Sequence, residues 1–252
     1  MINGWDIPVA VNTPRRTDDE LGSRGRSGVG QMRSHIRRQF RELGCSTTIQ
    51  RTVFLPAIEG LIQGRGHYFS FDDESLFSSK GLKPEEGHDT TFVPDGGKYQ
   101  DAVQVDDELA YGFGYTDEWT VMFWEMVDNT HHAFRSDGAG FEGGNGAPPP
   151  GFTSMSEGVL TFTKPAGDIQ IDELVVVPYV APREMIQGMI DMDEKYSPLP
   201  VLKLSGPVID VDQIYCEGAI TRSDYQVAHI DGAYRNNSQV VSFELTETEV
   251  VE

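Results

Sequence analysis

Alternating apolar and polar positions recur along this chain and predict a fold built mainly from β-strands. The pattern is clearest from His67 onward, where short runs of period two are separated by turn-forming residues. The strands expected from it lie at 5–11, 67–72, 102–106, 109–114, 119–127, 159–163, 169–177, 201–204, 208–220, 225–230 and 240–245. The run 119–127 is apolar on both faces, which indicates an inner strand of a two-sheet sandwich.

Two segments carry a helical pattern instead. Residues 53–63 place Pro56 in a first turn, where its missing N–H costs nothing, and they gather apolar side chains on one face. Residues 182–192 predict a second short helix that starts at Pro182. Residues 32–50 fit either a long strand or a short helix, because their period of two is imperfect. Residues 13–31 are polar and rich in glycine, which is typical of a long loop or arm.

Charge is distributed unevenly over the 252 residues. The formal net charge is −20, from 40 acidic and 20 basic side chains. Residues 1–66 contain ten Arg, no Lys and six acids, a formal charge of +4, so the remainder of the chain carries −24. Repulsion by this acidic body disfavours binding to nucleic acid or to an anionic membrane. The arginines of the first segment could dock on acidic surfaces, including that of a neighbouring copy. The alternative is that they line the solvated outer face of a strand.

Several classes of protein are disfavoured by simple features of the sequence. The longest nearly apolar run, 174–182, is too short to span a bilayer, and residues 1–6 lack the pattern of a secretory signal. Cys45 and Cys216 are the only cysteines; we expect two small buried side chains, with a disulfide between them left open. No pair of closely spaced cysteines supports a zinc site.

A search for catalytic chemistry yields no constellation. His131 and His132 are neighbours on an expected strand, so they point to opposite faces and cannot share a metal. Acidic runs at 72–74, 106–108 and 117–118 fall in expected turns, where solvated carboxylates are the rule. Calcium binding fits such loop carboxylates better than catalysis does, because calcium prefers hard oxygen ligands, but no EF-hand spacing is present. We therefore expect no catalytic residues, no metal ligands and no cofactor, with calcium as the one open alternative.

Several stretches resemble known protein families. Residues 119–135, Trp-Thr-Val-Met-Phe-Trp-Glu-Met through His-Ala-Phe-Arg, resemble the central strands of laminin-G-like, concanavalin A-like jelly rolls. The "IDEL" of 171–174 and the helical turn after Pro182 are similar to the closing strand and helix of the same families. Residues 60–72 and 77–82 resemble structural proteins of tailed bacteriophages and related prokaryotic viruses. Together these resemblances cover roughly residues 50–195.

The resemblances imply a mainly β fold in three parts. A basic N-terminal β module with one helix would span residues 1–66 and serve assembly. A concanavalin A-like jelly-roll sandwich would span 67–196, and a C-terminal β-rich extension would span 197–252. No calcium or sugar motif of these families has a matching set of residues here, so none is transferred.

The leading interpretation is a non-enzymatic virion structural protein, made in the host cytoplasm, that forms homo-oligomers on a tail, a tail tip or a capsid surface. Its expected partners are other copies of itself and other virion proteins. Arg33, Arg37, Arg38 and Arg41 are the candidate anchor residues. The alternative is a carbohydrate-binding module for host surface glycans, with Phe141 and Phe152 as candidate loop aromatics. A glycoside hydrolase ranks below both. It needs two carboxylates that face each other, and Glu125 is the one acid on the apolar core face of the expected strands.

Overall fold

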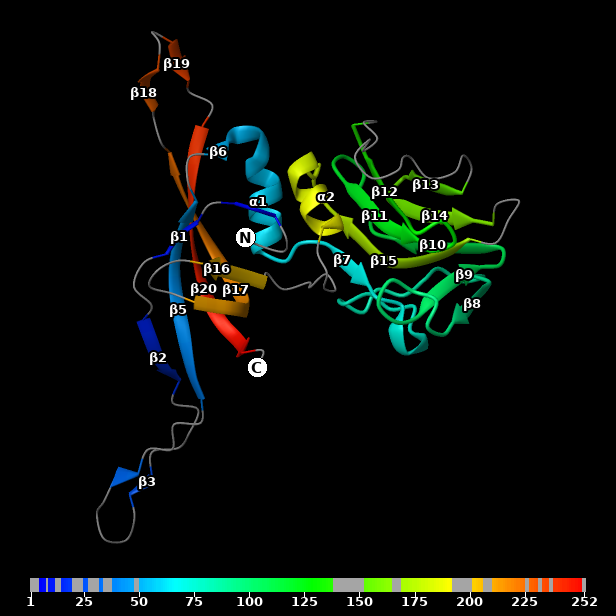
Figure 1. The fold of residues 1–252 in the computed structure, drawn as a ribbon, viewed down its shortest axis with the longest axis horizontal. Coiled ribbons are helices and arrows are strands. Elements are labelled where there is room, and N and C mark those ends of the chain that lie inside the picture. The colour runs from blue at the N-terminus through cyan, green and yellow to red at the C-terminus, as the bar shows by residue number, and fades with distance from the viewer. Residues whose placement is uncertain are drawn as a thin grey trace. The chain divides into compact units, whose positions relative to one another are not determined.

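Short antiparallel strands and two eight-residue helices make up the computed structural model of the chain (Figure 1). The structure describes residues 50–137, 152–164 and 169–191 without a break. It also describes shorter stretches at 5–7, 9–11, 15–19, 25–26, 32–33, 38–47, 201–205, 210–224, 227–230, 233–235 and 238–250. The chain divides into two compact units. Unit 1 consists of Met1–Ile2, Ile7–Leu55 and Leu199–Glu252, and unit 2 consists of Asn3–Asp6 and Pro56–Pro198.

Unit 2 contains two antiparallel sheets, which confirms the expected mainly β fold. One sheet has the order β12-β11-β15-β9-β8, with β7 also pairing with β15, and the other has the order β10-β14-β13. The strands are β7 (His67–Phe69), β8 (Thr90–Val93), β9 (Ala102–Val105), β10 (Glu108–Gly112), β11 (Thr120–Glu125), β12 (Thr130–Arg135), β13 (Thr153–Ser156), β14 (Val159–Thr163) and β15 (Gln170–Val177). The strand expected at 119–127 is thus β11, an inner strand flanked by β12 and β15.

The core of unit 2 lies between these two sheets. Alternate residues of the larger sheet, among them Val121, Phe123 and Val176, pack in one buried cluster with Leu109, Tyr111 and other residues of the smaller sheet. Inward positions two residues apart on each strand supply this cluster, as the pleat of a β-strand requires. Aromatic rings dominate it; Phe123 and Phe162, for example, meet edge to face with centroids 5.3 Å apart.

The two helices of unit 2 begin where the sequence predicts. A 3₁₀ turn, η1 (Thr52–Phe54), leads into α1 (Leu55–Ile62), and Gly64 with φ 57° follows the helix. Ile58, Leu61 and Ile62 of α1 are fully buried. Helix α2 (Arg183–Ile190) has Pro182 as its N-cap and buries Met185 and Ile186. A second 3₁₀ turn, η2 (Asp72–Glu74), carries the acidic run that was expected in a turn.

Unit 1 is one sheet that joins both ends of the chain. Its order is β1-β5-β20-β17-β16, with β2 pairing with β5 and β6 with β20. The strands are β1 (Val9–Val11), β2 (Arg15–Asp19), β5 (Arg38–Thr47), β6 (Gln50–Arg51), β16 (Val201–Ser205), β17 (Asp210–Asp224) and β20 (Ser238–Val250). Ser46 on β5 lies opposite Ser242 on β20. The expected N-terminal module and C-terminal extension are therefore one unit, which corrects their separation; the ambiguous segment 32–50 is largely strand β5.

Two β-ribbons belong to unit 1. In the first, β2 pairs with β5 and, further along, β3 (Gly25–Arg26) pairs with β4 (Met32–Arg33). In the second, β17 pairs with β20, and β18 (Val227–Ile230) pairs with β19 (Ala233–Arg235). We call residues 15–42, which include the first of these, the basic ribbon. The segment 13–31, expected to be a loop or arm, thus contributes strands β2 and β3 to the basic ribbon.

Candidate interaction surface and buried polar cluster

Three of the four candidate anchor arginines lie on strands of the basic ribbon. Arg33 ends β4, and Arg38 and Arg41 lie on β5, whereas Arg37 is outside the described residues. Between residues 21 and 41 the chain carries six arginines and no acid. A two-stranded ribbon has no core of its own, so a run of one charge sign along it favours contact with an oppositely charged surface.

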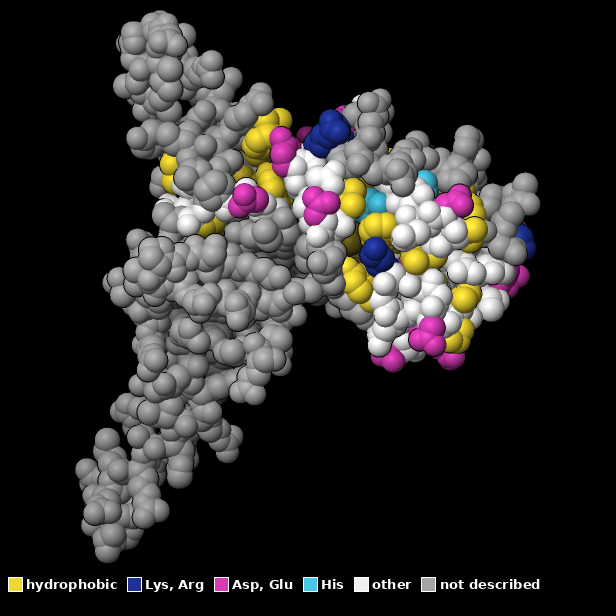
Figure 2. All heavy atoms as spheres, viewed as in Figure 1, with side chains coloured by type: hydrophobic (Ala, Val, Ile, Leu, Met, Phe, Trp, Pro, Cys, Tyr) yellow, Lys and Arg dark blue, Asp and Glu magenta, His cyan; other side chains and the backbone are white. Residues whose placement is uncertain are grey.

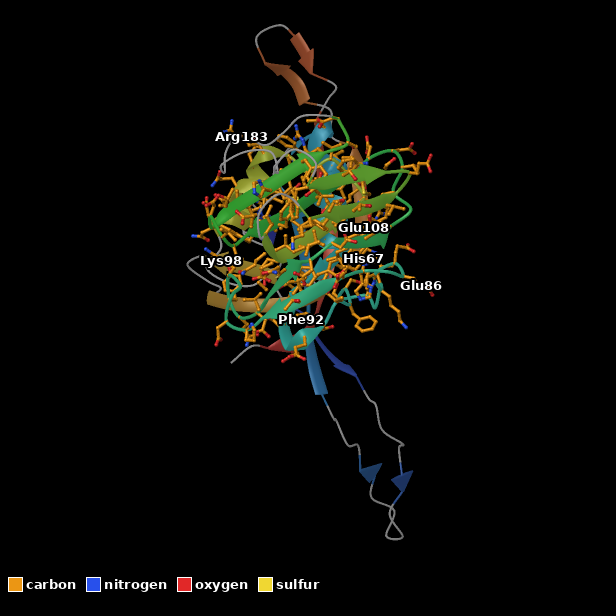
Figure 3. The ribbon with its side chains drawn as sticks, turned by 90° about the vertical axis from the view of Figure 1, so that its right-hand side faces the viewer. His67, Glu86, Phe92, Lys98, Glu108 and Arg183 are labelled. Carbon is orange, nitrogen blue, oxygen red and sulfur yellow. The ribbon has the colours of Figure 1, made fainter. Side chains whose placement is uncertain are left out.

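The sandwich of unit 2 supplies the opposite charge. The segments of unit 2 contain 27 acidic and 8 basic side chains, a formal charge of −19. Figure 2 shows Asp and Glu side chains scattered over the visible face of this unit with few Lys or Arg among them. In Figure 3, Glu86 and Glu108 lie on one side of the sandwich and Lys98 on the other. The arginines at 21–41 and the acidic residues of unit 2 thus place opposite charges in two different parts of the chain.

Of the two candidate glycan-binding aromatics, only Phe152 can be placed. Phe141 lies outside the described residues. Phe152 is fully buried, and its ring lies 6.1 Å from that of Phe123 and 5.5 Å from that of Phe162. This placement corrects the expectation for Phe152. The Gly- and Pro-rich stretch before it indicates a loop, but its side chain fills the core between the sheets.

A different aromatic row is partly exposed. Phe113 and Tyr115 stack with ring centroids 5.7 Å apart, and the His67 ring lies 5.3 Å from that of Phe113. The signal in the sequence is Tyr111-Gly-Phe-Gly-Tyr115, which alternates aromatic residues with glycine at period two. Phe113 and Tyr115 were not identified from the sequence as candidate surface aromatics. Next to this row, a small hollow of about 10 Å³ is lined by Gly64, Arg65, Gly66, His67, Tyr68, Val175 and Val177.

His67 and Ser78 form a contact that superficially resembles a catalytic pair. His67 Nδ1 lies 3.0 Å from Ser78 Oγ, and burial and the nearby charge of Lys80 lower the pKa of His67. Ser78 is buried, however, and its Oγ accepts hydrogen bonds from the backbone N–H groups of Lys80 and Leu82. These bonds hold a turn, so we assign Ser78 to loop structure and not to nucleophilic chemistry.

Two buried carboxylates interrupt the apolar strand β15. Asp172, 1% exposed, accepts a 2.7 Å hydrogen bond from the backbone N–H of Lys98. Glu173 accepts a 2.6 Å hydrogen bond from the Tyr68 hydroxyl. Burial of Tyr68, together with its interaction with Glu173, raises the pKa of Tyr68. Glu173 has φ 49°, and the register between β11 and β15 shifts at this point, so Glu173 occupies a β-bulge.

These carboxylates were not anticipated, although the signal was present. The pair lies inside the otherwise apolar run of 171–177 and could have been found by asking which acids interrupt a buried strand. Glu125, which was anticipated, accepts hydrogen bonds from the backbone N–H groups of Val127 and Asp128. The acids therefore bind backbone or tyrosine groups that hold loops and strands, and this arrangement does not favour glycoside hydrolysis.

The histidine pair is split between the two faces of the sheet, as the sequence predicts. The His132 ring lies 5.2 Å from that of Phe123 on the core side, and the His131 ring lies 5.2 Å from that of Trp124 on the other side. His131 Nδ1 is buried with no hydrogen-bond partner among the described residues. Burial, with smaller effects of His132 and Lys98, lowers the pKa of His131 to about 3, so this imidazole is neutral at pH 7.

Several further titratable groups of the described residues have defined surroundings. No group of three or more His, Cys, Asp or Glu able to hold a metal occurs among the described residues. Asp106 accepts hydrogen bonds from Thr91 Oγ1 and Gln104 Nε2, which lower its pKa. Cys45 is buried, and burial raises the pKa of its thiol to about 12. Within the described part of the chain, no helix is long and apolar enough to cross a membrane.

Comparison with known proteins does not assign the chain to a family. No family model, no curated protein and no solved structure matches it.

Proposed function

We propose that this protein is a structural component of a virus particle that assembles in multiple copies through its basic ribbon. The observation that carries the proposal is the separation of charge: six arginines without an acid at 21–41, against a formal charge of −19 on the sandwich unit. The resemblance of residues 50–195 to prokaryotic virus structural proteins supports the particle as the location, after synthesis in the host cytoplasm. In this proposal the protein binds and assembles and does not catalyse a reaction.

The strength of single contacts explains why many copies matter. An exposed Arg–carboxylate pair contributes about 0 to 1 kcal/mol, so one ribbon on one sandwich binds weakly. Repeated, symmetric placement of the same pair of surfaces makes each further contact intramolecular within the assembly and raises the overall affinity. The interaction therefore becomes significant in a particle, where copies are held close together.

The test compares the full chain with a variant whose ribbon is shortened. Residues 16–41 are replaced by a two-residue Asn-Gly turn, which joins the directly opposed residues Arg15 and Glu42 in a hairpin and removes both strands' arginines beyond them. Sedimentation velocity at low and at high sodium chloride measures the assembly state of both proteins. We expect the full chain to form oligomers that dissociate with salt, and the shortened chain to remain monomeric. A full chain that is monomeric under all conditions overturns the proposal, as does a shortened chain that assembles equally well.

Two controls accompany this experiment. All three Trp residues lie in unit 2, so Trp fluorescence reports whether the sandwich of the shortened chain is still folded. Arg65→Glu changes an exposed basic residue of unit 2 and is expected to leave the assembly state unchanged. Immunogold labelling of virus particles from the source culture tests the location; particles that never carry the protein contradict it.

Glycan binding is the second candidate, favoured by the partly exposed row of Phe113 and Tyr115. Aromatic faces of this kind can stack on sugar rings, although both residues also pack against the core of unit 2. A glycan array with the intact protein and with Tyr115→Ala tests this candidate, and exposed Phe77→Ala is the control. Binding that Tyr115→Ala removes and Phe77→Ala retains supports a glycan site; no binding by the intact protein rejects it.

A further inference from the structure

The register of the basic ribbon divides its charges unequally between its two faces. Side chains of a β-strand alternate between faces, and directly opposed residues share a face. On one face Arg15 lies opposite Glu42, and Asp19 lies opposite Arg38. Each arginine at these two register positions thus lies opposite an acidic residue, and the formal charges of the two pairs cancel. We call this side of the ribbon the balanced face.

The other face has two arginines directly opposite one another. Arg16 pairs with Arg41, and the next pair on this face is Asp18 with Gln39. Like charges at directly opposed positions destabilise a strand pair. An Arg–Arg pair is therefore a poor choice for holding the ribbon together, whereas two arginines at opposed positions suit the binding of carboxylates from outside. We call this the arginine face.

The arginine face continues the buried face of the unit 1 sheet. Cys45 and Thr47 are 3% and 4% exposed, and Arg41 occupies the same face of β5 at period two. On the neighbouring strand Phe243 lies opposite Cys45 and is also buried. The face that is buried at Cys45 and Thr47 thus carries the Arg16–Arg41 pair further along the same strand, where β2 takes the place of β1 beside β5.

We propose that the arginine face binds the acidic sandwich of a second copy of this chain, with Arg16 and Arg41 together engaging its carboxylates. This inference rests on the proposed function and names the surface through which it operates. Each guanidinium offers five N–H donors in a planar fork that matches a carboxylate. The sandwich unit carries 27 acidic side chains against 8 basic ones, which makes another copy a complementary partner. A nucleic acid is disfavoured, because the chain as a whole carries −20.

The test uses two double variants that remove the same charge from the same ribbon. Arg16→Gln with Arg41→Gln changes the arginine face, and Arg15→Gln with Arg38→Gln changes the balanced face. Sedimentation equilibrium at low salt gives the dissociation constant of self-association for each full-length variant. We expect the first variant to weaken self-association by about tenfold or more, equivalent to about 1.4 kcal/mol, and the second to weaken it much less.

A third variant, Arg16→Lys with Arg41→Lys, keeps the charge and removes the planar fork. It should bind with intermediate affinity, because an ammonium cannot make the bidentate contact. Hydrogen exchange of the β2 and β5 amides shows whether each ribbon still forms. The arginine-face variant is expected to retain it, since it loses a like-charge pair. Loss of the ribbon in that variant would mean that these arginines are structural and would overturn the proposal.

The remaining outcomes separate this inference from the proposed function. If both Gln variants weaken self-association equally, the ribbon acts by net charge alone; the proposed function stands and the face-specific inference fails. If the unaltered chain does not self-associate, both fail. A fluorescent double-stranded DNA is included as a competing ligand, and tighter binding of this DNA than of a second copy, lost on changing Arg16 and Arg41, would overturn the choice of partner.

Discussion

The Tyr68 hydroxyl donates a 2.6 Å hydrogen bond to Glu173 Oε2 and so joins β7 to the bulge of β15. The two residues are 105 positions apart, and both are buried. Loss of one partner of a buried hydrogen bond costs about 1 to 3 kcal/mol. We expect Tyr68→Phe to lower the free energy of unfolding of unit 2 by that amount. Denaturant titration followed by Trp fluorescence measures it, and an unchanged midpoint would contradict it.

The backbone of Glu173 gives a second prediction. Its φ of 49° lies in the left-handed region, which costs an L-residue about 1 to 2 kcal/mol and costs glycine little. Glu173→Gly and Glu173→Ala both lose the bond to Tyr68, but only glycine relieves the backbone. We expect the glycine variant to be more stable than the alanine variant by about 1 kcal/mol. Ordinary strand positions show the reverse order, so an alanine variant that is more stable would reject a left-handed Glu173.

Gly60 of α1 predicts an unusual response to alanine. In a helix interior, Gly→Ala normally stabilises by about 1 kcal/mol. Here a Cβ on Gly60 would lie within van der Waals overlap of the buried Tyr179 ring, 2.9 Å from its Cζ. We expect Gly60→Ala to destabilise unit 2 by about 1 to 3 kcal/mol. The same change in a Tyr179→Leu background should cost less, and equal costs in both backgrounds would show that the ring is not responsible.

Phe152 is expected to matter for stability. Truncating a buried phenylalanine to alanine costs about 3 to 5 kcal/mol, because apolar contacts are lost and a cavity remains. Phe77 is 51% exposed, and Phe77→Ala should change the free energy of unfolding by about 0.5 kcal/mol or less. Thermal or denaturant unfolding of the two variants provides the comparison. A mild effect of Phe152→Ala would mean that its side chain lies outside the core.

His131 predicts a loss of stability in mild acid. Its pKa is about 3 in the folded protein against 6.5 for an ordinary histidine, so below pH 6.5 the unfolded chain binds a proton that the folded chain does not. Stability contributed by neutral His131 is complete above that pH and falls progressively towards pH 3. At pH 5 the loss is about 2 kcal/mol. The lowered pKa of His67 adds a loss of the same sign.

The control for this prediction is an exposed histidine. His131→Phe should reduce the difference in unfolding free energy between pH 7 and pH 5, whereas His88→Gln should leave it unchanged. If His131→Phe retains the full difference, the titrating group is a different one.

The sequence predicted best those elements whose own residues determine their structure. The apolar run at 119–127 and the position of Pro56 identified β11 and α1, because burial and proline geometry act locally. The segment 32–50 stayed ambiguous, because a two-stranded ribbon has little core to impose a strict alternation. The role of Phe152 was missed, since its packing partners come from strands distant in sequence.

The sites show the same division. The split of His131 and His132 between two faces follows from strand geometry alone and was predictable. The pairing of Arg16 with Arg41 was not, because register depends on which strands meet, and the composition of the segment shows only an excess of arginine. The buried carboxylates of β15 likewise depend on Tyr68 and on the loop at Lys98, which are brought to them by the fold.

The sheet shared by both ends of the chain has a consequence for biosynthesis. The Val241 N–H donates a 3.1 Å hydrogen bond to Thr47 Oγ1 across 194 positions of sequence. At a translation rate of about 5 to 20 residues per second, β5 waits about 10 to 40 seconds for β20 to leave the ribosome. The sandwich has meanwhile been synthesised in full and can fold first. The nascent chain therefore carries an open strand edge beside its arginines until late in synthesis, a period in which a chaperone or a premature neighbour could occupy it.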